Sequence, residues 1–384
     1  MRRYLFFRVV QAVITYFLFL TAVFFLINAQ PGDFGNMYYS NPKMTAQQRQ
    51  SIRVQLGLDK PVGERYLQWL GNFMKGNLGY SLSNFPRPVS DIILERAPRT
   101  LALFLTATIL SFYLGFLAGK ILAWRRGGTL EYVSTVGGVV LYTVFTPWFA
   151  LMMIWLFAVA LGVFPIGKFI TVSLWSDVPN LTTNTVFIPM ILTGLIVGIL
   201  LMVWTNAVRR FSPNRRNTYY WIGLAAILGV PILLWLVSGL GIYALDILYH
   251  LFLPVLTLTL ISFAGTMLLT RNSMLETLRE DYIVTARAKG LPEKVIRDKH
   301  AARNAMLPVV TSLVFALAFA ISGGIITETM FSWPGMGQTL LVAVEVEDIP
   351  LAIGALVFTG ILALTAHIVA DVLYAYLDPR IRYQ

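Results

Sequence analysis

The sequence predicts an all-α protein that crosses a membrane about eight times. Of its 384 residues, 57% are hydrophobic and only 13% are charged, whereas a typical soluble domain is about 25% charged. The apolar residues fall in charge-free runs of about 20 residues or more, which is the length that a helix needs to cross the hydrocarbon core. These runs do not alternate between apolar and polar residues, as membrane β-strands do. We therefore expect a polytopic transmembrane helical bundle.

Eight charge-free runs are the predicted spans. The first is longer than the apolar part of a signal peptide, so we interpret it as a membrane helix. The runs are Val9–Gly32, Thr100–Gly119, Tyr132–Gly167, Val178–Val208, Asn217–Leu245, Ile247–Thr270, Asn304–Thr327 and Ile349–Ala370. They divide the chain into a first transmembrane helix (1–32), an outer segment (33–99), transmembrane helices (100–169), a transmembrane hairpin (170–248) and a C-terminal core (249–384) with a charged loop at 271–305.

The basic residues predict the orientation of the chain. Short cytoplasmic segments are rich in Lys and Arg, whereas long segments cross the membrane largely regardless of charge. With the N-terminus inside, most of the 30 Lys and Arg residues fall on the inner side. They are Arg2, Arg3, Arg8, Lys120, Arg125, Arg126, Arg209, Arg210, Arg215, Arg216, eight in 271–303, Arg380 and Arg382. We expect both termini and the charged loop to be cytoplasmic, and residues 33–99 to be extracytoplasmic.

The outer segment has helix signals of its own. Thr45 and Gln48 have the spacing of a capping box, and Gly57 can end that helix. Pro61 can begin a second helix. We expect a small group of amphipathic helices on the outer face, which either lies on the membrane interface or receives a partner.

The densest charge cluster is the stretch "DYIVTARAKGLPEKVIRDKHAARNAMLP", Asp281–Pro308. Apolar residues at helical spacing precede Gly290, which suits the end of a helix, and Pro292 suits the start of the next. The stretch therefore predicts two short helices around a glycine elbow. Its residues leave two interpretations open: a basic loop that sets topology and binds anionic lipid, or a docking element, which the elbow and the mixed charges favour.

The sequence lacks the residues that several kinds of chemical site need. There is no cysteine, and the three histidines are scattered without metal-ligand spacing. The stretch "GFLAGKIL", Gly115–Leu122, lacks the spacing and the Ser or Thr of a phosphate-binding loop. We interpret its Lys120 as an interfacial anchor. Any ATP hydrolysis must therefore come from another polypeptide.

Two groups inside the spans are candidate functional sites. His367 and Asp371 lie four residues apart on one helical face. They are either a proton-carrying pair or a satisfied pair at a helix contact, which we favour. Small residues followed by a carboxylate, Ser322, Gly323, Gly324 and Glu328, indicate close helix packing around an external gate.

The charged loop resembles a known family. "DYIVTARAKGLPEKVIRDKHAARNAMLPVVT" is similar to the cytoplasmic loop of the inner-membrane permease subunits of binding-protein-dependent ABC importers, in the dipeptide/oligopeptide/nickel permease family. Other blocks resemble the same family in the same order. They are "PGD" (Pro31–Asp33), "LGLDKPVGERYLQWLGNFMKGNLGYSL" (Leu56–Leu82), "ERAPRTLAL" (Glu95–Leu103), "ETMFSWPGMGQTLLVAV" (Glu328–Val344) and "DVLYAYLDPRIRY" (Asp371–Tyr383).

The resemblance implies a coupling helix that inserts into a groove of a cytoplasmic ATPase. The residues that match it are Thr285, Ala286, Arg287, Ala288, Lys289, Gly290 and Leu291. The general permease signature begins Glu-Ala-Ala, and this chain has Val284, Thr285 and Ala286 there, so no contact through a Glu is expected. The family pattern leads us to expect six spans, which makes 170–248 an inserted hairpin.

The resemblance also implies partners and a function. It implies a non-catalytic, multi-pass subunit of a prokaryotic inner membrane, which binds no cofactor itself because ATP and Mg²⁺ bind to the ATPases. The partners would be a second, similar or identical permease subunit, two cytoplasmic ATPase subunits, an extracytoplasmic solute-binding protein and the lipid bilayer, with no nucleic acid. Di- and oligopeptides are the favoured substrates, with oligosaccharides or nickel complexes as alternatives.

Two other classes of protein are the rivals. A proton-coupled secondary transporter would use His367 and Asp371, and it would leave the glycine elbow unexplained. A membrane-embedded enzyme would need a nucleophile–base pair or a metal cluster, and the sequence shows neither.

Overall fold

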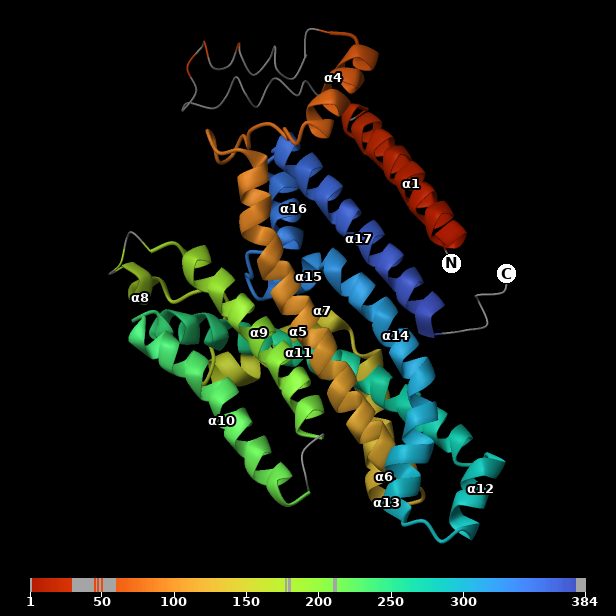
Figure 1. The fold of residues 1–384 in the computed structure, drawn as a ribbon. Coiled ribbons are helices and arrows are strands. Elements are labelled where there is room, and N and C mark those ends of the chain that lie inside the picture. Colours follow the sequence, from red (N-terminus) through yellow and green to blue (C-terminus); the bar gives the residue numbers. More distant parts are fainter. Residues whose placement is uncertain are drawn as a thin grey trace. The chain divides into compact units, whose positions relative to one another are not determined.

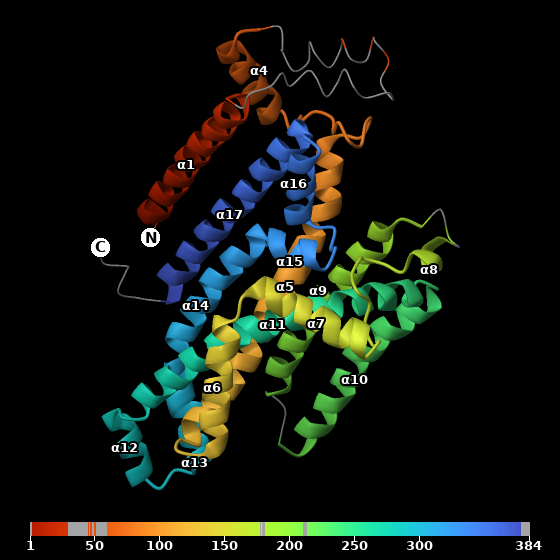
Figure 2. The same ribbon diagram turned by 180° about the vertical axis from the view of Figure 1, so that it is seen from behind.

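The computed structural model describes residues 2–29, 60–176, 181–209 and 213–377, together with the single residues 45, 47, 50 and 178. Within these ranges the regular elements are helices, and the one β pairing is an isolated bridge between Tyr80 and Pro88. The predicted all-α class is confirmed (Figures 1 and 2). The outer helix that we predicted from Gln48 and Gly57 lies largely outside the described residues.

Seven of the described helices are long and apolar enough to cross a membrane, and a bent pair can form an eighth span. The seven are α1 (Arg2–Asn28), α5 (Val89–Trp124), α9 (Thr183–Val208), α10 (Pro213–Val237), α11 (Gly241–Thr277), α14 (Ala302–Ser322) and α17 (Ile349–Leu377). Each overlaps a predicted run, and the bent pair overlaps the remaining one.

The third predicted span is not one straight helix. It consists of α6 (Thr129–Thr143), then α7 (Thr146–Ile154) with a π-helical extension η1 (Trp155–Ala160), bent by 106°. Val144 between them is extended, with φ −65° and ψ 139°. Pro147 lies in the first turn of α7, where its missing N–H costs no hydrogen bond. A proline at this position prevents α6 from continuing into α7 as one regular helix.

The described chain forms two compact units, which we treat separately. The first contains Met1–Met152 and Val255–Gln384, and the second contains Met153–Pro254. In the second unit, α9 and α10 pack against each other, and this unit includes the predicted hairpin 170–248.

A buried acid organises one end of the second unit. Asp246 of α11 accepts hydrogen bonds from the Thr171 backbone N–H (2.9 Å), the Thr171 hydroxyl (2.6 Å) and the Trp175 indole N–H (2.8 Å). Trp175 belongs to the short helix α8 (Val172–Ser176). Since a buried carboxylate needs such donors, Asp246 fixes the α8 segment on α11.

In the first unit, α5 lies directly on α11. A Cβ atom added at Gly119 would lie 2.5 Å from the backbone oxygen of Met267, and one at Gly115 would lie 2.7 Å from Thr266 Cβ. Two glycines four residues apart allow helix backbones to approach this closely. The N-terminal part of α5 shares an apolar core with α16 (Met336–Glu345) and α17, and α14 packs on both α5 and α17.

Helix α4 (Val62–Met74) lies on one end of α1, as both views show (Figures 1 and 2). The hydroxyls of Thr21 and Tyr66 are 2.7 Å apart, and the rings of Phe24 and Trp69 have centroids 5.3 Å apart. Pro61 is the residue before this helix, which confirms the helix start predicted there.

The contact at Gly119 generates a prediction. Gly119→Ala places a methyl group against the backbone of α11. We expect this overpacking to lower the unfolding free energy by about 1–3 kcal/mol, so that the purified protein unfolds at a lower temperature. Gly137→Ala is the matched control, because a Cβ there meets nothing within 4 Å. Thermal unfolding in detergent measures both variants. An unchanged midpoint for Gly119→Ala would show that the two helices do not touch there.

Candidate functional site

The charged loop forms the predicted pair of helices around a glycine. Helix α12 spans Asp281–Ala288, and Gly290 adopts the left-handed conformation with φ +72°. The N–H groups of Gly290 and Leu291 close the helix by donating to the carbonyls of Arg287 (2.9 Å) and Ala286 (3.3 Å). Pro292 then precedes α13 (Glu293–Val295), which continues through the π-helical segment η2 (Ile296–Ala301) into α14.

One face of α12 is fixed to the protein. Ile283 and Ala286 are 0% and 6% exposed and belong to an apolar core with residues of α5, α11, η2 and α14. The Asn304 amide donates to the Tyr282 hydroxyl at 2.7 Å, and the Ser273 hydroxyl donates to the Ala305 carbonyl at 2.9 Å. An apolar core and the bond to Asn304 therefore attach α12 to the helices beneath it, and the Ser273 bond joins two of those helices, α11 and α14.

The opposite face of the elbow is exposed, and we call it the elbow surface. It consists of Thr285, Arg287, Ala288, Lys289, Gly290 and Leu291. A side chain added at Gly290 would meet nothing within 4 Å. Ala286, which we predicted among the docking residues, has its side chain in the core instead, so it supports the surface from inside.

Ion pairs connect the loop region to neighbouring helices. Lys120 of α5 lies 3.1 Å from Asp298 of η2, measured from Nζ to Oδ1. Lys120, which we expected to be an interfacial anchor, is thus also paired with the loop. Arg271 near the end of α11 donates to Glu131 at the start of α6, and Glu131 also accepts the Gly127 N–H at 2.6 Å.

A second group of predicted residues surrounds a buried carboxylate. Glu328 lies in α15 (Ile325–Met330) and is 0% exposed. Its oxygens accept hydrogen bonds from the Thr100 hydroxyl (2.7 Å) and from the Gln338 N–H in the first turn of α16 (2.9 Å). The Thr100 oxygen in turn accepts the Met336 N–H at 2.7 Å. The carboxylate therefore joins α5, α15 and α16.

The glycines near Glu328 allow this arrangement. Gly323 is left-handed, with φ +77°, and a Cβ at Gly335 would collide with the Glu328 carboxylate. Gly323 and Gly324 also line a mostly apolar pocket of about 700 Å³. Ser322 ends α14. Both views place α15 between the end of α14 and α16, part-way along α5 (Figures 1 and 2).

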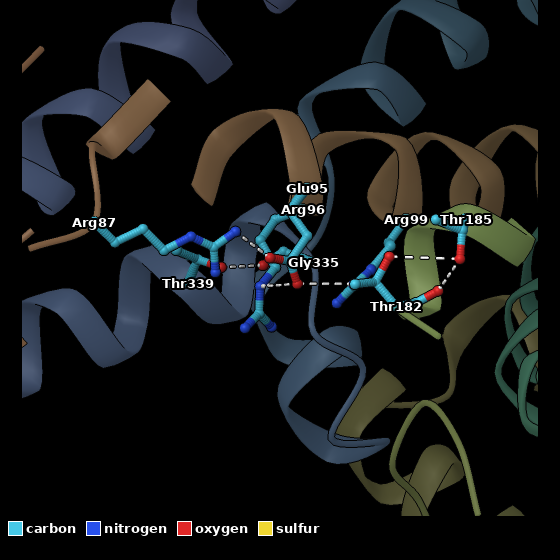
Figure 3. A network of polar contacts seen from close by, with 8 residues as sticks. All are labelled: Arg87, Glu95, Arg96, Arg99, Thr182, Thr185, Gly335 and Thr339. Atoms are coloured by element: carbon cyan, nitrogen blue, oxygen red, sulfur yellow. Dashed lines mark hydrogen bonds and ion pairs between the residues drawn. The ribbon is translucent and has the colours of Figure 1, made fainter. Parts of the chain in front are cut away.

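Polar side chains that we did not single out in the sequence lie at the start of α5. Glu95 pairs with Arg87, with Arg99 at 2.8 Å and with Arg96 at 3.7 Å. Figure 3 shows Arg87, Glu95 and Arg96 close to Gly335, which precedes α16, and to Thr339 of α16. The indole N–H of Trp333 donates to the Arg99 carbonyl at 3.1 Å. The ion pairs thus join residues at the start of α5, and the Trp333 bond attaches the segment between α15 and α16 to α5.

Comparisons with known proteins agree with this architecture. Residues 180–383 match the family described as binding-protein-dependent transport system inner membrane component, and residues 1–104 match its N-terminal region. The chain belongs to this family.

Full-length relatives support the same membership. A di/tripeptide transport system permease protein of Pseudomonas aeruginosa is 31% identical over 370 residues, which cover 96% of each chain. An oligopeptide transport system permease protein of Bacillus subtilis is 30% identical and covers 94% of this chain and 93% of its own. A dipeptide transport system permease protein of Escherichia coli K12 is 29% identical, covering 97% and 96%. This transport component is therefore a multi-pass inner-membrane protein.

In this transport component, His367 and Asp371 have separate partners. The His367 Nδ1 atom lies 2.7 Å from the Ala363 carbonyl oxygen. Asp371 pairs with Arg8 of α1 at 3.4 Å, from Oδ2 to Nε. Asp371 thus connects α17 to α1, which is the kind of contact that the helix-contact interpretation expects. Among the described residues, no three His, Asp or Glu side chains could together hold a metal ion.

The Glu328 contact generates a second prediction. Thr100→Val leaves the Glu328 carboxylate and the Met336 N–H each without one hydrogen bond. Since each unsatisfied buried group costs about 1–3 kcal/mol, we expect a loss of about 2–6 kcal/mol of unfolding free energy. Thr270→Val is the matched control: Thr270 is 0% exposed, and its hydroxyl donates to the Thr266 carbonyl of its own helix. Denaturant or thermal unfolding would compare them. Equal losses in both variants would contradict a special role for Thr100.

Proposed function

We propose that the chain is the permease subunit of an ATP-driven importer, and that it forms the path by which di- or oligopeptides cross the inner membrane. The observation that carries the proposal is the elbow surface: exposed, charged and rigidly supported, in a chain of a binding-protein-dependent transport family. The named relatives are di/tripeptide, oligopeptide and dipeptide permease proteins, which favours peptides over oligosaccharides or nickel complexes.

In this proposal the elbow surface docks into a groove of a partner ATPase. Thr285, Arg287, Ala288, Lys289, Gly290 and Leu291 make the contact, and Ala286 holds the helix from inside. ATP and Mg²⁺ bind to the ATPase, and this chain has a non-catalytic role. When the groove closes, α12 moves as a rigid body, because its inner face belongs to the core shared with α11 and α14. This movement shifts α11 and α14 and so switches the pathway between inward-open and outward-open states.

The proposed assembly places the loop in the cytoplasm and α4 outside. Both views put α12 and α4 at opposite ends of the first unit, which supports placing them on opposite sides of the membrane (Figures 1 and 2). Residues 33–99 then face an extracytoplasmic solute-binding protein, and both termini are cytoplasmic. A second permease subunit and two ATPase subunits complete the importer. Ser322, Gly323, Gly324 and Glu328 belong to its gate, where they shape the turn between α14 and α16.

Docking at the elbow is tested by Gly290→Trp. The indole has room on the protein itself but fills the space that an ATPase groove must occupy, so we expect the ATPase to be lost from the solubilised complex. Gly127→Trp is the matched control: Gly127 is also left-handed, with φ +85°, and also open, but it lies between α5 and α6. Co-purification from membranes of the native host, with an ATPase assay, measures both.

Either of two results would refute the docking proposal. One is that no ATPase accompanies the wild-type chain. The other is that both tryptophan variants retain the ATPase equally well. Uptake of labelled peptides, oligosaccharides and nickel by cells that carry the intact system then identifies the substrate class.

The proposed orientation has its own test, because the chain contains no cysteine. We expect a membrane-impermeant maleimide added outside to label Met74→Cys at α4, whose side chain is 78% exposed. It should leave Lys289→Cys at the elbow unlabelled until the membrane is opened. In a Gram-negative host the outer membrane is first made permeable. Labelling of Lys289→Cys in sealed cells would reverse the orientation.

A further inference from the structure

We infer that the ion pair between Lys120 and Asp298 couples the elbow to α5, and that α5 carries the elbow's movement to the Glu328 contact. This inference rests on the proposed function, and it names positioning residues for energy transfer that lie outside the elbow surface. It treats α5 as the link between the docking end and the gate.

At the docking end, the link begins in η2, the segment that follows the elbow and leads into α14. Asp298 lies in η2, between the elbow and α14, and its Oδ1 atom is 3.1 Å from Lys120 Nζ. The two side chains are only 33% and 17% exposed. Ala123 and Trp124, one turn further along α5, share an apolar core with Ile296 of η2. A movement of η2 therefore presses on α5 through both a charge contact and apolar contacts.

Charge balance alone does not require Lys120 at this position. Asp298 already has a cation on its own segment, because Arg297 donates to both of its oxygens at 2.9 Å. What Lys120 adds is a connection between two helices that are far apart in the sequence. The Arg297 contact, made between neighbouring residues, transmits nothing to α5.

The gate end of the link is the Thr100 hydroxyl. It donates to the buried Glu328 carboxylate and accepts the Met336 N–H, and the Arg99 carbonyl accepts the Trp333 indole N–H. Lys120 and Thr100 lie on one unbroken helix, separated by about 30 Å at 1.5 Å per residue. Because an α-helix is stiff along its axis, a displacement near Lys120 reaches the α15–α16 turn.

The test is the number of peptides transported per ATP hydrolysed by the complete importer in proteoliposomes. With Lys120→Met or Asp298→Asn we expect the ATPase to stay bound and active, while transport per ATP falls on the order of tenfold, a usual size for coupling between distant sites. Arg297→Met should keep the wild-type ratio. The exchanged pair, Lys120→Asp with Asp298→Lys, should recover most of it. Wild-type ratios in both neutralised variants would overturn the inference.

A cross-link decides the question if a neutralised variant does not accumulate. Lys120→Cys with Asp298→Cys, joined by a short bis-maleimide in this cysteine-free chain, fixes η2 to α5. We expect the cross-linked importer to keep transporting, because the two segments move together. Loss of transport after cross-linking, with both singly modified cysteines active, would show that they must separate, and the inference would fail.

The failure of this inference is distinct from the failure of the proposed function. If the wild-type chain retains no ATPase, the proposed function fails and the inference fails with it. If the wild-type importer couples normally and the neutralised variants couple equally well, only the Lys120–Asp298 link is refuted.

Discussion

The close approach of α5 to α11 is the contact on which the arrangement of the first unit depends. Lipid tails are as apolar as leucine, so helices in a membrane gain little by burying apolar side chains against each other, and close packing and hydrogen bonds hold them instead. Gly115 and Gly119 remove the side chains that would keep the two backbones apart. With α5 fixed there, its C-terminal end reaches the loop core, and Thr100, further toward its N-terminus, reaches Glu328.

Three buried acids, Glu328, Asp246 and Asp348, accept hydrogen bonds from segments that are far apart in the sequence. Glu328 holds α15 and α16 on α5, and Asp246 holds the α8 segment on α11. Asp348 accepts hydrogen bonds from the hydroxyls of Ser81 and Ser83 and from the N–H of Leu351 at the start of α17. An ionisable residue inside a membrane protein is by default a functional candidate, but here each of these acids has donors that account for its position.

The sequence was informative wherever the signal is local. Apolar runs located the spans, and Gly290 and Pro292 located the elbow, because length, left-handed backbone and helix starts are properties of neighbouring residues. The bend between α6 and α7 had a local sign, Pro147, which interrupts the third predicted run and left a kink and ordinary packing as equal alternatives. The Thr100–Glu328 and Lys120–Asp298 contacts join residues more than 170 positions apart. Local residue spacing therefore could not predict these contacts. The glycines of "GFLAGKIL" were visible, but we compared them with a nucleotide loop and not with a helix crossing.

If the elbow docks as proposed, its apolar inner face has a mechanical role. A glycine hinge alone would let α12 tilt freely. Movement of the docked partner would then only bend the loop. Ile283 and Ala286 remove that freedom, because tilting α12 would expose them to water, and the Asn304–Tyr282 hydrogen bond ties the helix to α14. In the proposed docking, the exposed residues therefore fit the partner, while the buried ones pass the movement of α12 to the helices.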